Sequence, residues 1–416
     1  MADFPLISPP PVTSDLPARR PGRTVAGATA TTIACVLPVF LVGGLAVQLG
    51  AELRFSPAGL GLAVAVYFGV SALASVPSGA LVERYGPART ARAGILLAAA
   101  TMLAIAVLAR SYAALVGLLA VGAGANALGQ LASNTALARG VPAGRQGLSF
   151  GLKQAAIPMA TLLAGAAVPT VALTAGWRWA FVIAAGLALA TLPLVPPDSA
   201  PGGRETGRQA RRASGALVVL GAAATLAAGG ANALGTFVVD SAAVRGLSPA
   251  LAGLVLTFGG TLCVFGRVGA GWWADRRTGG YVGIIAGMLV VGAGGLGLLT
   301  LSGPVPLVVG VTLGFGIGWA WPGLLNLAVV RLHPQAPAAA TSITQTGVYL
   351  GGCLGPLGFG TVAAHIGYPT MWTAAAGALL GAAGLMLVGR RMLLRNRNPA
   401  PAPAALGRPS GAGSSG

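Results

Sequence analysis

The stretch that decides the fold is Gly79-Ala80-Leu81-Val82-Glu83-Arg84-Tyr85-Gly86-Pro87-Ala88-Arg89, a short charged island between two long apolar runs. A second island, Gly271-Trp272-Trp273-Ala274-Asp275-Arg276-Arg277, also lies between apolar runs. Glu83 and Asp275 are 192 positions apart, as are Gly79 and Gly271. A fixed spacing between two similar motifs indicates an internal repeat.

Other positions of the chain keep this spacing. Asn134 corresponds to Asn326 at 192 positions, and after one deletion Gln154 corresponds to Gln345 at 191 positions. Because chance does not keep one register over this length, the sequence predicts two copies of one unit.

The composition predicts a membrane protein. Of the 416 residues 55% are hydrophobic and only 8% are charged, with a mean hydropathy of +0.79, whereas about a quarter of residues in a soluble domain are charged. A helix needs ~20 apolar residues to cross a bilayer, and the charge-free segments provide twelve such spans, six per copy. The expected helices cover 28–50, 58–80, 91–109, 112–138, 149–173, 177–196, 215–239, 249–274, 281–301, 305–330, 341–364 and 369–389.

These spans define the expected domains of an all-α membrane protein. A six-helix bundle covers 28–196, a second covers 215–389, and residues 197–214 form a linker rich in Pro, Gly, Ser and Arg. Residues 1–27 and 390–416 are expected to be disordered tails, because their composition offers no packing pattern. The first 23 residues are Pro-rich and lack the apolar core of a signal peptide.

The net charge of +18 comes almost entirely from arginine. Twenty arginines fall in the tails and the even-to-odd loops, whereas the opposite loops hold only four. The positive-inside rule therefore predicts that both termini are cytoplasmic in a bacterial inner membrane, so the basicity does not indicate nucleic-acid binding. Cys35, Cys263 and Cys353 all lie inside spans, which argues against a disulfide framework.

The two charged islands resemble the signature loop of the major facilitator superfamily, Gly-x-Leu-Ala-Asp-Arg-x-Gly between helices 2 and 3. The first copy has Glu for Asp, and Pro87-Ala88 replaces the usual basic pair. The resemblance covers roughly residues 28–390. It implies two six-helix bundles with a substrate site between them and alternating access. The matching residues are Gly79, Leu81, Glu83, Arg84 and Gly86 in the first copy, and Gly271, Asp275 and Arg276 in the second.

A carboxylate in such a loop can accept hydrogen bonds from the positive end of a neighbouring helix and from arginine. These contacts break when the two bundles rock, so the loops are expected to form a cytoplasmic gate. The alternative is a solvated turn that only sets topology. The expected gate residues are Gly79, Glu83, Arg84, Gly86, Arg89, Asn134, Arg267, Gly271, Asp275, Arg276 and Asn326.

Lys153, the only lysine, lies near the start of the fifth helix. An ionisable residue inside a membrane span suggests a functional site, and a central cation suits a carboxylate or phosphate of a substrate. The alternative is that Lys153 extends its ammonium to the nearby membrane surface.

Amides and aromatic residues in helices 4, 5, 7, 10 and 11 complete the expected substrate site. Amides facing lipid would be unsatisfied, so they are expected to face the interior, where they line the site or join helices. The substrate-binding candidates are Asn126, Gln130, Lys153, Gln154, Asn232, Thr236, Trp319, Trp321, Gln345 and Tyr349.

The function predicted is secondary active transport of a small organic solute, preferably anionic, by rocker-switch alternating access. None of the eight acids lies in mid-membrane, which disfavours the first alternative, a multidrug or natural-product exporter. The second alternative is a membrane sensor or scaffold that does not transport. The expected partners are the substrate, the lipid bilayer and a coupling ion such as a proton. We expect a monomer that has no enzymatic activity and binds no nucleic acid, metal or cofactor.

Overall fold

The computed structural model describes residues 21–55, 57–197, 215–247 and 249–397. Within these ranges twelve helical segments are long and apolar enough to cross a membrane. The predicted all-α membrane fold with twelve spans is therefore confirmed. The linker residues 198–214 and the tail residues 1–20 and 398–416 lie outside the described ranges.

The N-terminal half contains the first six spans. Its elements are α1 (Pro21–Gly44), α2 (Ala46–Leu53), α3 (Pro57–Tyr85), α4 (Pro87–Leu108), α5 (Tyr112–Gly140), η1 (Ala143–Arg145), α6 (Gln146–Ala167), η2 (Val168–Ala172), α7 (Trp177–Ala190) and η3 (Leu192–Leu194).

The C-terminal half repeats this order of spans. Its elements are α8 (Gly215–Val244), α9 (Pro249–Ala274), α10 (Tyr281–Leu298), α11 (Pro304–Leu313), η4 (Gly314–Gly318), α12 (Pro322–Leu332), α13 (Pro337–His365) and α14 (Tyr368–Arg397).

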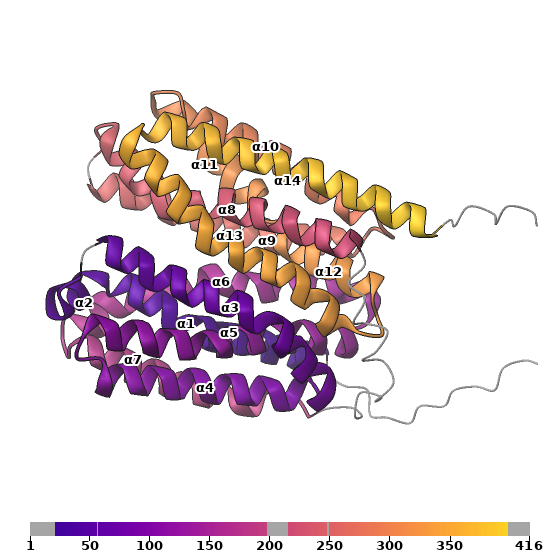
Figure 1. Cartoon of the computed structure of the whole chain (residues 1–416), viewed down its shortest axis with the longest axis horizontal. Coiled ribbons are helices and arrows are strands. Elements are labelled where there is room, and N and C mark those ends of the chain that lie inside the picture. Colours follow the sequence, from indigo (N-terminus) through magenta and orange to yellow (C-terminus); the bar gives the residue numbers. More distant parts are fainter. Residues whose placement is uncertain (1–20, 56, 198–214, 248, 398–416) are drawn as a thin grey trace, which may run out of the picture.

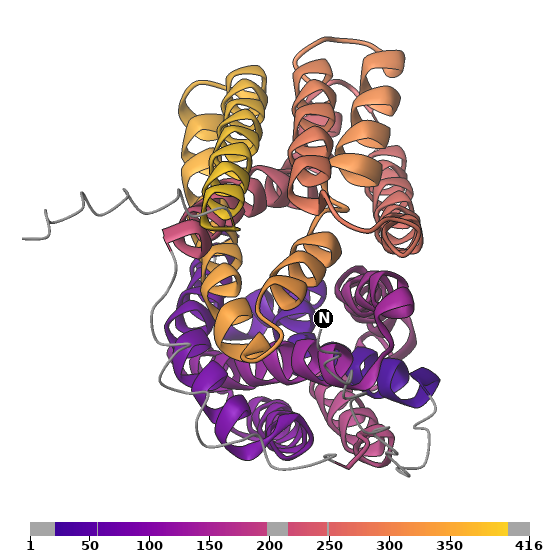
Figure 2. The same cartoon turned by 90° about the vertical axis from the view of Figure 1, so that its right-hand side faces the viewer.

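The two halves form separate bundles that meet along two pairs of helices. In Figure 1 the N-terminal bundle lies below the C-terminal bundle, and the two approach each other toward the right-hand end. The contacts between them run mainly along α3 with α13 and α6 with α9. Figure 2 looks at that right-hand end and shows orange helices of the C-terminal half reaching onto the N-terminal half.

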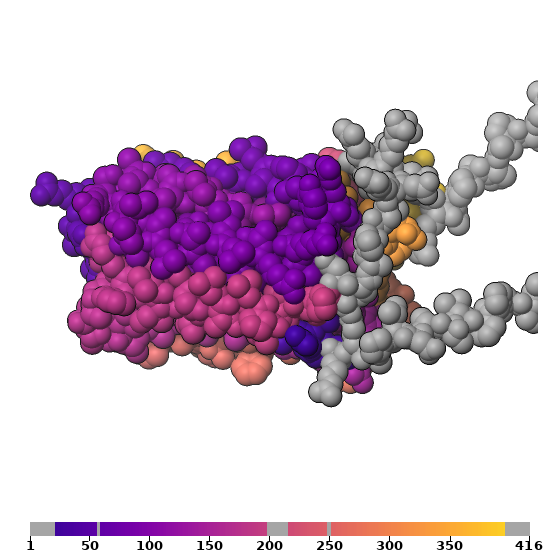
Figure 3. All heavy atoms as spheres, turned by 90° about the horizontal axis from the view of Figure 1, so that it is seen from below, coloured from indigo at the N-terminus to yellow at the C-terminus, as the bar shows by residue number. Residues whose placement is uncertain are grey.

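The outer faces of the bundles expose apolar side chains, as a lipid-facing surface requires. Figure 3 shows the N-terminal bundle from below, where its own residues form nearly the whole visible face. On α4 and α7 the exposed side chains include Leu103, Val107, Ile183 and Leu187. So much exposed apolar surface would be a liability in water but is suited to hydrocarbon.

Three predicted boundaries were wrong. Residues 21–27, expected in the disordered tail, belong to α1, which begins at Pro21; proline at a first helical position costs no hydrogen bond. The C-terminal tail is shorter than expected as well, because α14 continues to Arg397. The expected first helix is also divided, since α1 ends at Gly44 and α2 follows.

The expected tenth helix is interrupted. α11 ends at Leu313, a π-helical turn follows over Gly314–Gly318, and α12 begins at Pro322. Glycine weakens a helix because it has many other backbone conformations available, and proline lacks the N–H that a continuous helix would use. This concentration of both residue types explains the break.

Candidate functional site

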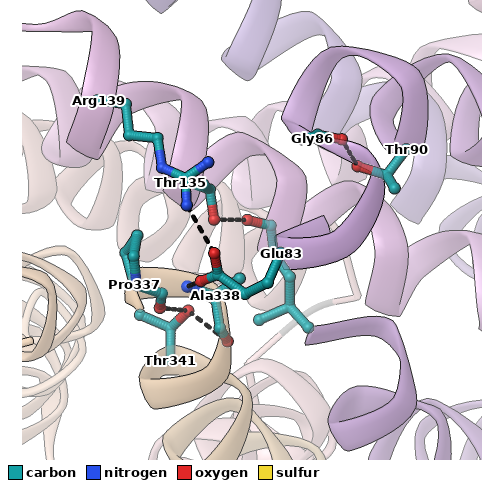
Figure 4. A network of polar contacts seen from close by, with 9 residues as sticks. Glu83, Gly86, Thr90, Thr135, Arg139, Pro337, Ala338 and Thr341 are labelled. Atoms are coloured by element: carbon teal, nitrogen blue, oxygen red, sulfur yellow. Dashed lines mark hydrogen bonds and ion pairs between the residues drawn. The ribbon is translucent and has the colours of Figure 1, made fainter. Parts of the chain in front are cut away.

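Glu83 links the two halves at the end of the molecule where α3 meets α4 and α9 meets α10, hereafter the basic end. Its Oε1 accepts a hydrogen bond of 2.9 Å from the backbone N–H of Ala338, in the first turn of α13. Its Oε2 forms a 2.6 Å ion pair with Arg139 of α5. Figure 4 shows Glu83 between these two partners. The carboxylate thus sits at the positive end of a helix of the other half.

Asp275 makes the matching contact in the opposite direction. Its Oδ1 and Oδ2 accept hydrogen bonds from the backbone N–H groups of Gly147 at 2.6 Å and Leu148 at 2.8 Å, in the first turn of α6. Gly147 and Ala338 are 191 positions apart and therefore equivalent in the repeat. The two contacts, Glu83 on α13 and Asp275 on α6, are called the carboxylate caps below.

The arginines beside the caps break the symmetry of the repeat. Arg139 pairs with Glu83, but its equivalent Arg331 donates to the hydroxyl of Tyr281 and to the carbonyl oxygen of Ala143. Ala143 belongs to the N-terminal half, so Arg331 forms a third connection between the halves at the basic end.

Glycines let α6 and α9 cross in close contact between the caps. A Cβ atom on Gly271 would overlap the carbonyl oxygen of Gly147, and one on Gly151 would lie 2.5 Å from the carbonyl oxygen of Arg267. Gly79 has the same role on α3, where a Cβ would lie 3.0 Å from the Cβ of Ser342 on α13. The glycines at these crossings are required by the neighbouring helix, not by unusual backbone angles.

Gly271→Ala should therefore force the halves apart at the basic end. The added methyl group meets backbone atoms that cannot move alone, so α6 and α9 must separate. In a variant without the native cysteines, a cysteine at Ser342, which is buried at this interface, should react with maleimide at least about ten-fold faster when Gly271→Ala is added. Gly253→Ala, also on α9 but with open space around it, is the control. Equal labelling rates for the two variants would contradict this prediction.

Lys153 on α6 is fully buried, with 0% of the residue exposed. Its Nζ donates to Oε1 of Gln130 and, at 3.0 Å, to Oδ1 of Asn134, both on α5. The ammonium therefore lies inside the N-terminal half and not at the membrane surface. Asn134, expected in the gate, is a partner of Lys153 instead.

Arg267 on α9 lies next to this lysine cluster. It is 3% exposed, and its guanidinium donates to the backbone carbonyl oxygens of Gln154 at 2.7 Å and Trp319 at 3.3 Å. Lys153 and Arg267 are the buried charged side chains of the described residues. The acids within the twelve spans are Glu83 and Asp240, each within five residues of a helix end. The interior formed by the described residues thus contains two cations without a buried carboxylate.

Several buried polar atoms of the candidate residues have no hydrogen-bond partner. Asn126 uses its amide N–H on Ser71 at 3.2 Å, but its carbonyl oxygen is unpaired. An unpaired buried polar group costs about 1–3 kcal/mol, so these atoms are suited to bind water or a polar solute. The unpaired atoms are Asn126 Oδ1, Asn134 Nδ2, Gln154 Oε1, Trp321 Nε1, Asn326 Nδ2 and the Tyr349 hydroxyl.

Other predicted site residues have different surroundings. Asn232 is half-buried and donates to Ala228 of its own helix at 2.8 Å, and Thr236 is exposed. Trp319 is half-buried beneath Arg267, at 5.7 Å from the guanidinium carbon to the ring centre. Gln345 is buried on α13.

Three expected gate residues, all arginines, are exposed, and none of them forms a hydrogen bond or ion pair with the other half among the described residues. Arg84 lies over the ring of Tyr85 at 5.2 Å, and Arg276 lies over that of Trp272 at 3.3 Å. Arg89 is exposed on α4. Gly86 has a positive φ of 87° and forms the turn before α4. The caps therefore depend on the carboxylates and on helix N-termini more than on these arginines.

Sequence reasoning missed Arg139, Arg331 and the residues that the carboxylates cap. The equal spacing of 192 positions between Arg139 and Arg331 was the available signal. At the end opposite the basic end it also missed a cluster within one half, where Glu52 accepts from Trp177 Nε1 at 2.6 Å and pairs with Arg178 at 2.7 Å. Trp177 and then Arg178 hold the pKa of the Glu52 carboxyl below its usual value.

Comparison with known proteins identifies the family and the fold. The family profile described as Major Facilitator Superfamily matches residues 24–356, and no curated protein matches the sequence. The fold is similar to that of the proton:xylose symporter XylE bound to a bromodeoxyglucose, with a TM-score of 0.75 and 15% identity, covering 88% of this chain and 95% of that one.

It is also similar to the transporter FucP in its outward conformation, with a TM-score of 0.70 and 14% identity over 88% of this chain and 98% of that one. The human organic anion transporter MFSD10 gives a TM-score of 0.70 and 16% identity, covering 88% of this chain and 99% of that one. At these identities the likeness shows the fold alone. Since the family profile covers most of the sequence, the chain belongs to the major facilitator superfamily of membrane transporters.

Proposed function

We propose that this protein is a secondary transporter that moves a small organic anion across a bacterial inner membrane. The observation that carries this proposal is the pair of buried cations, Lys153 and Arg267, with no buried carboxylate among the described residues. An uncompensated buried charge is costly, and an anionic substrate offsets that cost when it binds.

The unpaired polar atoms of the candidate residues supply the rest of the binding chemistry. Asn126 and Gln154 in the N-terminal half offer amide oxygens, whereas Tyr349 on α13 offers a hydroxyl from the other half. A solute that carries an acid and at least one hydroxyl or amino group satisfies both kinds of atom. Because the two halves contribute separately, their relative motion exposes such a site to one side and then the other.

The carboxylate caps provide the gate. Both caps are formed and α6 crosses α9 closely, so the two halves touch at the basic end, which supports a closed gate there. Each cap is an interaction of a charge with helix N–H groups, worth about 1.5–3 kcal/mol. A few such contacts suffice to balance two conformations, so substrate binding energy can shift that balance. Coupling to a proton and the monomeric state stay predictions.

The basic end should face the cytoplasm, because twenty arginines lie in the tails and loops of that side and four in the opposite loops. Alkaline phosphatase fused at residue 205 is expected to be inactive in cells, and a fusion at Arg110 is expected to be active. The same two positions fused to a cytoplasmic reporter should give the reverse pattern. Phosphatase activity at residue 205 would contradict the orientation.

A thermal-shift screen of the purified protein tests the substrate class. The panel contains small carboxylates, phosphate esters, neutral sugars and lipophilic cations. A ligand that binds only the folded protein stabilises it by mass action and so raises its melting temperature. At a ligand concentration of 100 times the Kd, the free energy of unfolding increases by about 2.7 kcal/mol. Stabilisation by carboxylates or phosphate esters is expected. Stabilisation by lipophilic cations instead, or by no compound, contradicts the proposal.

A further inference from the structure

An open apolar groove of about 420 Å³ lies in the C-terminal half, and neither Lys153 nor Arg267 is among its lining residues. Three elements form it: α9, α10 and the interrupted helix from η4 to α12. Its described lining is uncharged, and the indole of Trp273 is its main polar feature. The lining residues used below are Gly266, Gly269 and Trp273 on α9, and Gly316 and Ile317 in η4.

The groove exists because small residues leave space between helices. A Cβ atom on Gly266 would overlap the carbonyl oxygen of Gly316, so α9 and η4 touch there and close the floor. One turn further along α9, Gly269 is exposed, and a Cβ atom added there would have no neighbouring atom within 4 Å. Ile317, which is 39% exposed, borders the open side. The groove is thus open to the surrounding hydrocarbon.

Basic and aromatic side chains meet at one end of the groove. Trp273 lines it and is 37% exposed, and the guanidinium carbon of Arg277 lies 4.2 Å from the centre of its ring. Arg276 lies over Trp272 in the same way. In the described chain neither arginine has a carboxylate within ion-pair distance. Tryptophan prefers the membrane–water interface, which places both guanidinium groups at the level of lipid headgroups.

We propose that this groove binds one acyl chain of an anionic phospholipid from the leaflet at the basic end, with the lipid phosphate held by Arg277 and Arg276. The uncharged lining matches an acyl chain, which needs no hydrogen bonds. The two arginines, which have no carboxylate partner in the described chain, match an anionic headgroup, as basic sites between transmembrane helices do. A soluble anion could contact the arginines but would not fill the groove. A neutral lipid could fill the groove but would not make the charge contact.

Native mass spectrometry of the delipidated full-length protein tests this site. The protein is titrated with phosphatidylglycerol, with phosphatidylcholine of the same acyl chains, and with glycerol phosphate, which has no acyl chain. We expect one phosphatidylglycerol to bind at least ten-fold more tightly than phosphatidylcholine, and glycerol phosphate not to compete. Gly269→Leu, which fills the groove, should remove this tight binding. Arg277→Gln should remove the preference for phosphatidylglycerol but retain the lipid.

Matched controls separate the site from general effects. Gly287→Leu places the same side chain at an exposed, open position on α10 outside the groove, and Arg145→Gln removes an exposed arginine before α6. Both should bind phosphatidylglycerol like the unaltered protein. If Gly269→Leu binds phosphatidylglycerol as tightly as the unaltered protein, the bound lipid is only surrounding bulk lipid. If glycerol phosphate competes, the arginines form a site for soluble phosphate. Either outcome overturns the proposal. If Gly269→Leu does not fold, an unchanged headgroup preference in Arg277→Gln overturns it alone.

Discussion

Glu83→Gln and Asp275→Asn should each open the basic end of the protein. Each variant keeps a hydrogen-bond acceptor but loses the charge that favours the helix N-terminus of the other half. With about 1–2 kcal/mol lost per cap, the balance between closed and open forms shifts by about ten-fold. A cysteine at Ser342 should then react with maleimide about ten-fold faster, and the double variant faster still.

Glu52→Gln is the matched control for this experiment. It removes a carboxylate of the same charge and similar pairing, but the partners of Glu52, Trp177 and Arg178, lie in the same half. It should therefore leave the labelling rate unchanged. If Glu83→Gln and Asp275→Asn label no faster than Glu52→Gln, the caps do not hold the gate closed and the charged islands only set topology.

Lys153→Met should impair substrate binding without a comparable loss of stability in the empty protein. Methionine keeps most of the side-chain volume and removes a buried charge that has no carboxylate partner in the described chain. The melting temperature without ligand is expected to change little, because the relief of removing a buried charge is offset by the loss of the donor to Gln130 Oε1 and Asn134 Oδ1. The shift caused by an anionic ligand should disappear, since the loss of a charged hydrogen bond of about 1.5–3 kcal/mol lowers affinity roughly ten- to hundred-fold.

Lys153→Ala and Lys153→Arg complete this series. Alanine should abolish anion binding as methionine does, although it also leaves a cavity. Arginine should keep part of the binding, because it retains the charge but has a wider, planar head group. Melting curves with the best anion of the screen give all three comparisons. Unchanged affinity in Lys153→Ala and Lys153→Met would remove Lys153 from the site and with it most of the case for an anion.

The caps show how far sequence reasoning reaches. The repeat spacing and the charge of Glu83 and Asp275 predicted a carboxylate held by a helix N-terminus. The partner helices could not be predicted from the islands themselves, because a helix N-terminus carries its partial charge on backbone groups that any residue provides. Only the folded chain shows that Ala338 and Gly147 are the residues capped.

The orientation of single side chains was less predictable. Lys153 lies close enough to the end of its helix to reach the surface, and its direction depends on Gln130 and Asn134 of a neighbouring helix. Helical periodicity places a residue on a face of its own helix but does not say which helix packs there. The interior position of Asn126 and Gln130 was predictable because amides facing lipid would be unsatisfied. The exposure of Thr236 was not predicted, because its hydroxyl can donate to its own helix.

Solute counterflow in proteoliposomes tests the transport proposal most directly. Vesicles loaded with the anion that gives the largest thermal shift are diluted into a trace of the same radiolabelled anion. Alternating access around Lys153 predicts a transient, saturable accumulation of label in the unaltered protein, reduced at least about ten-fold in Lys153→Met and absent in empty vesicles. Accumulation that is equal in Lys153→Met, or seen only with lipophilic cations, would contradict the proposal.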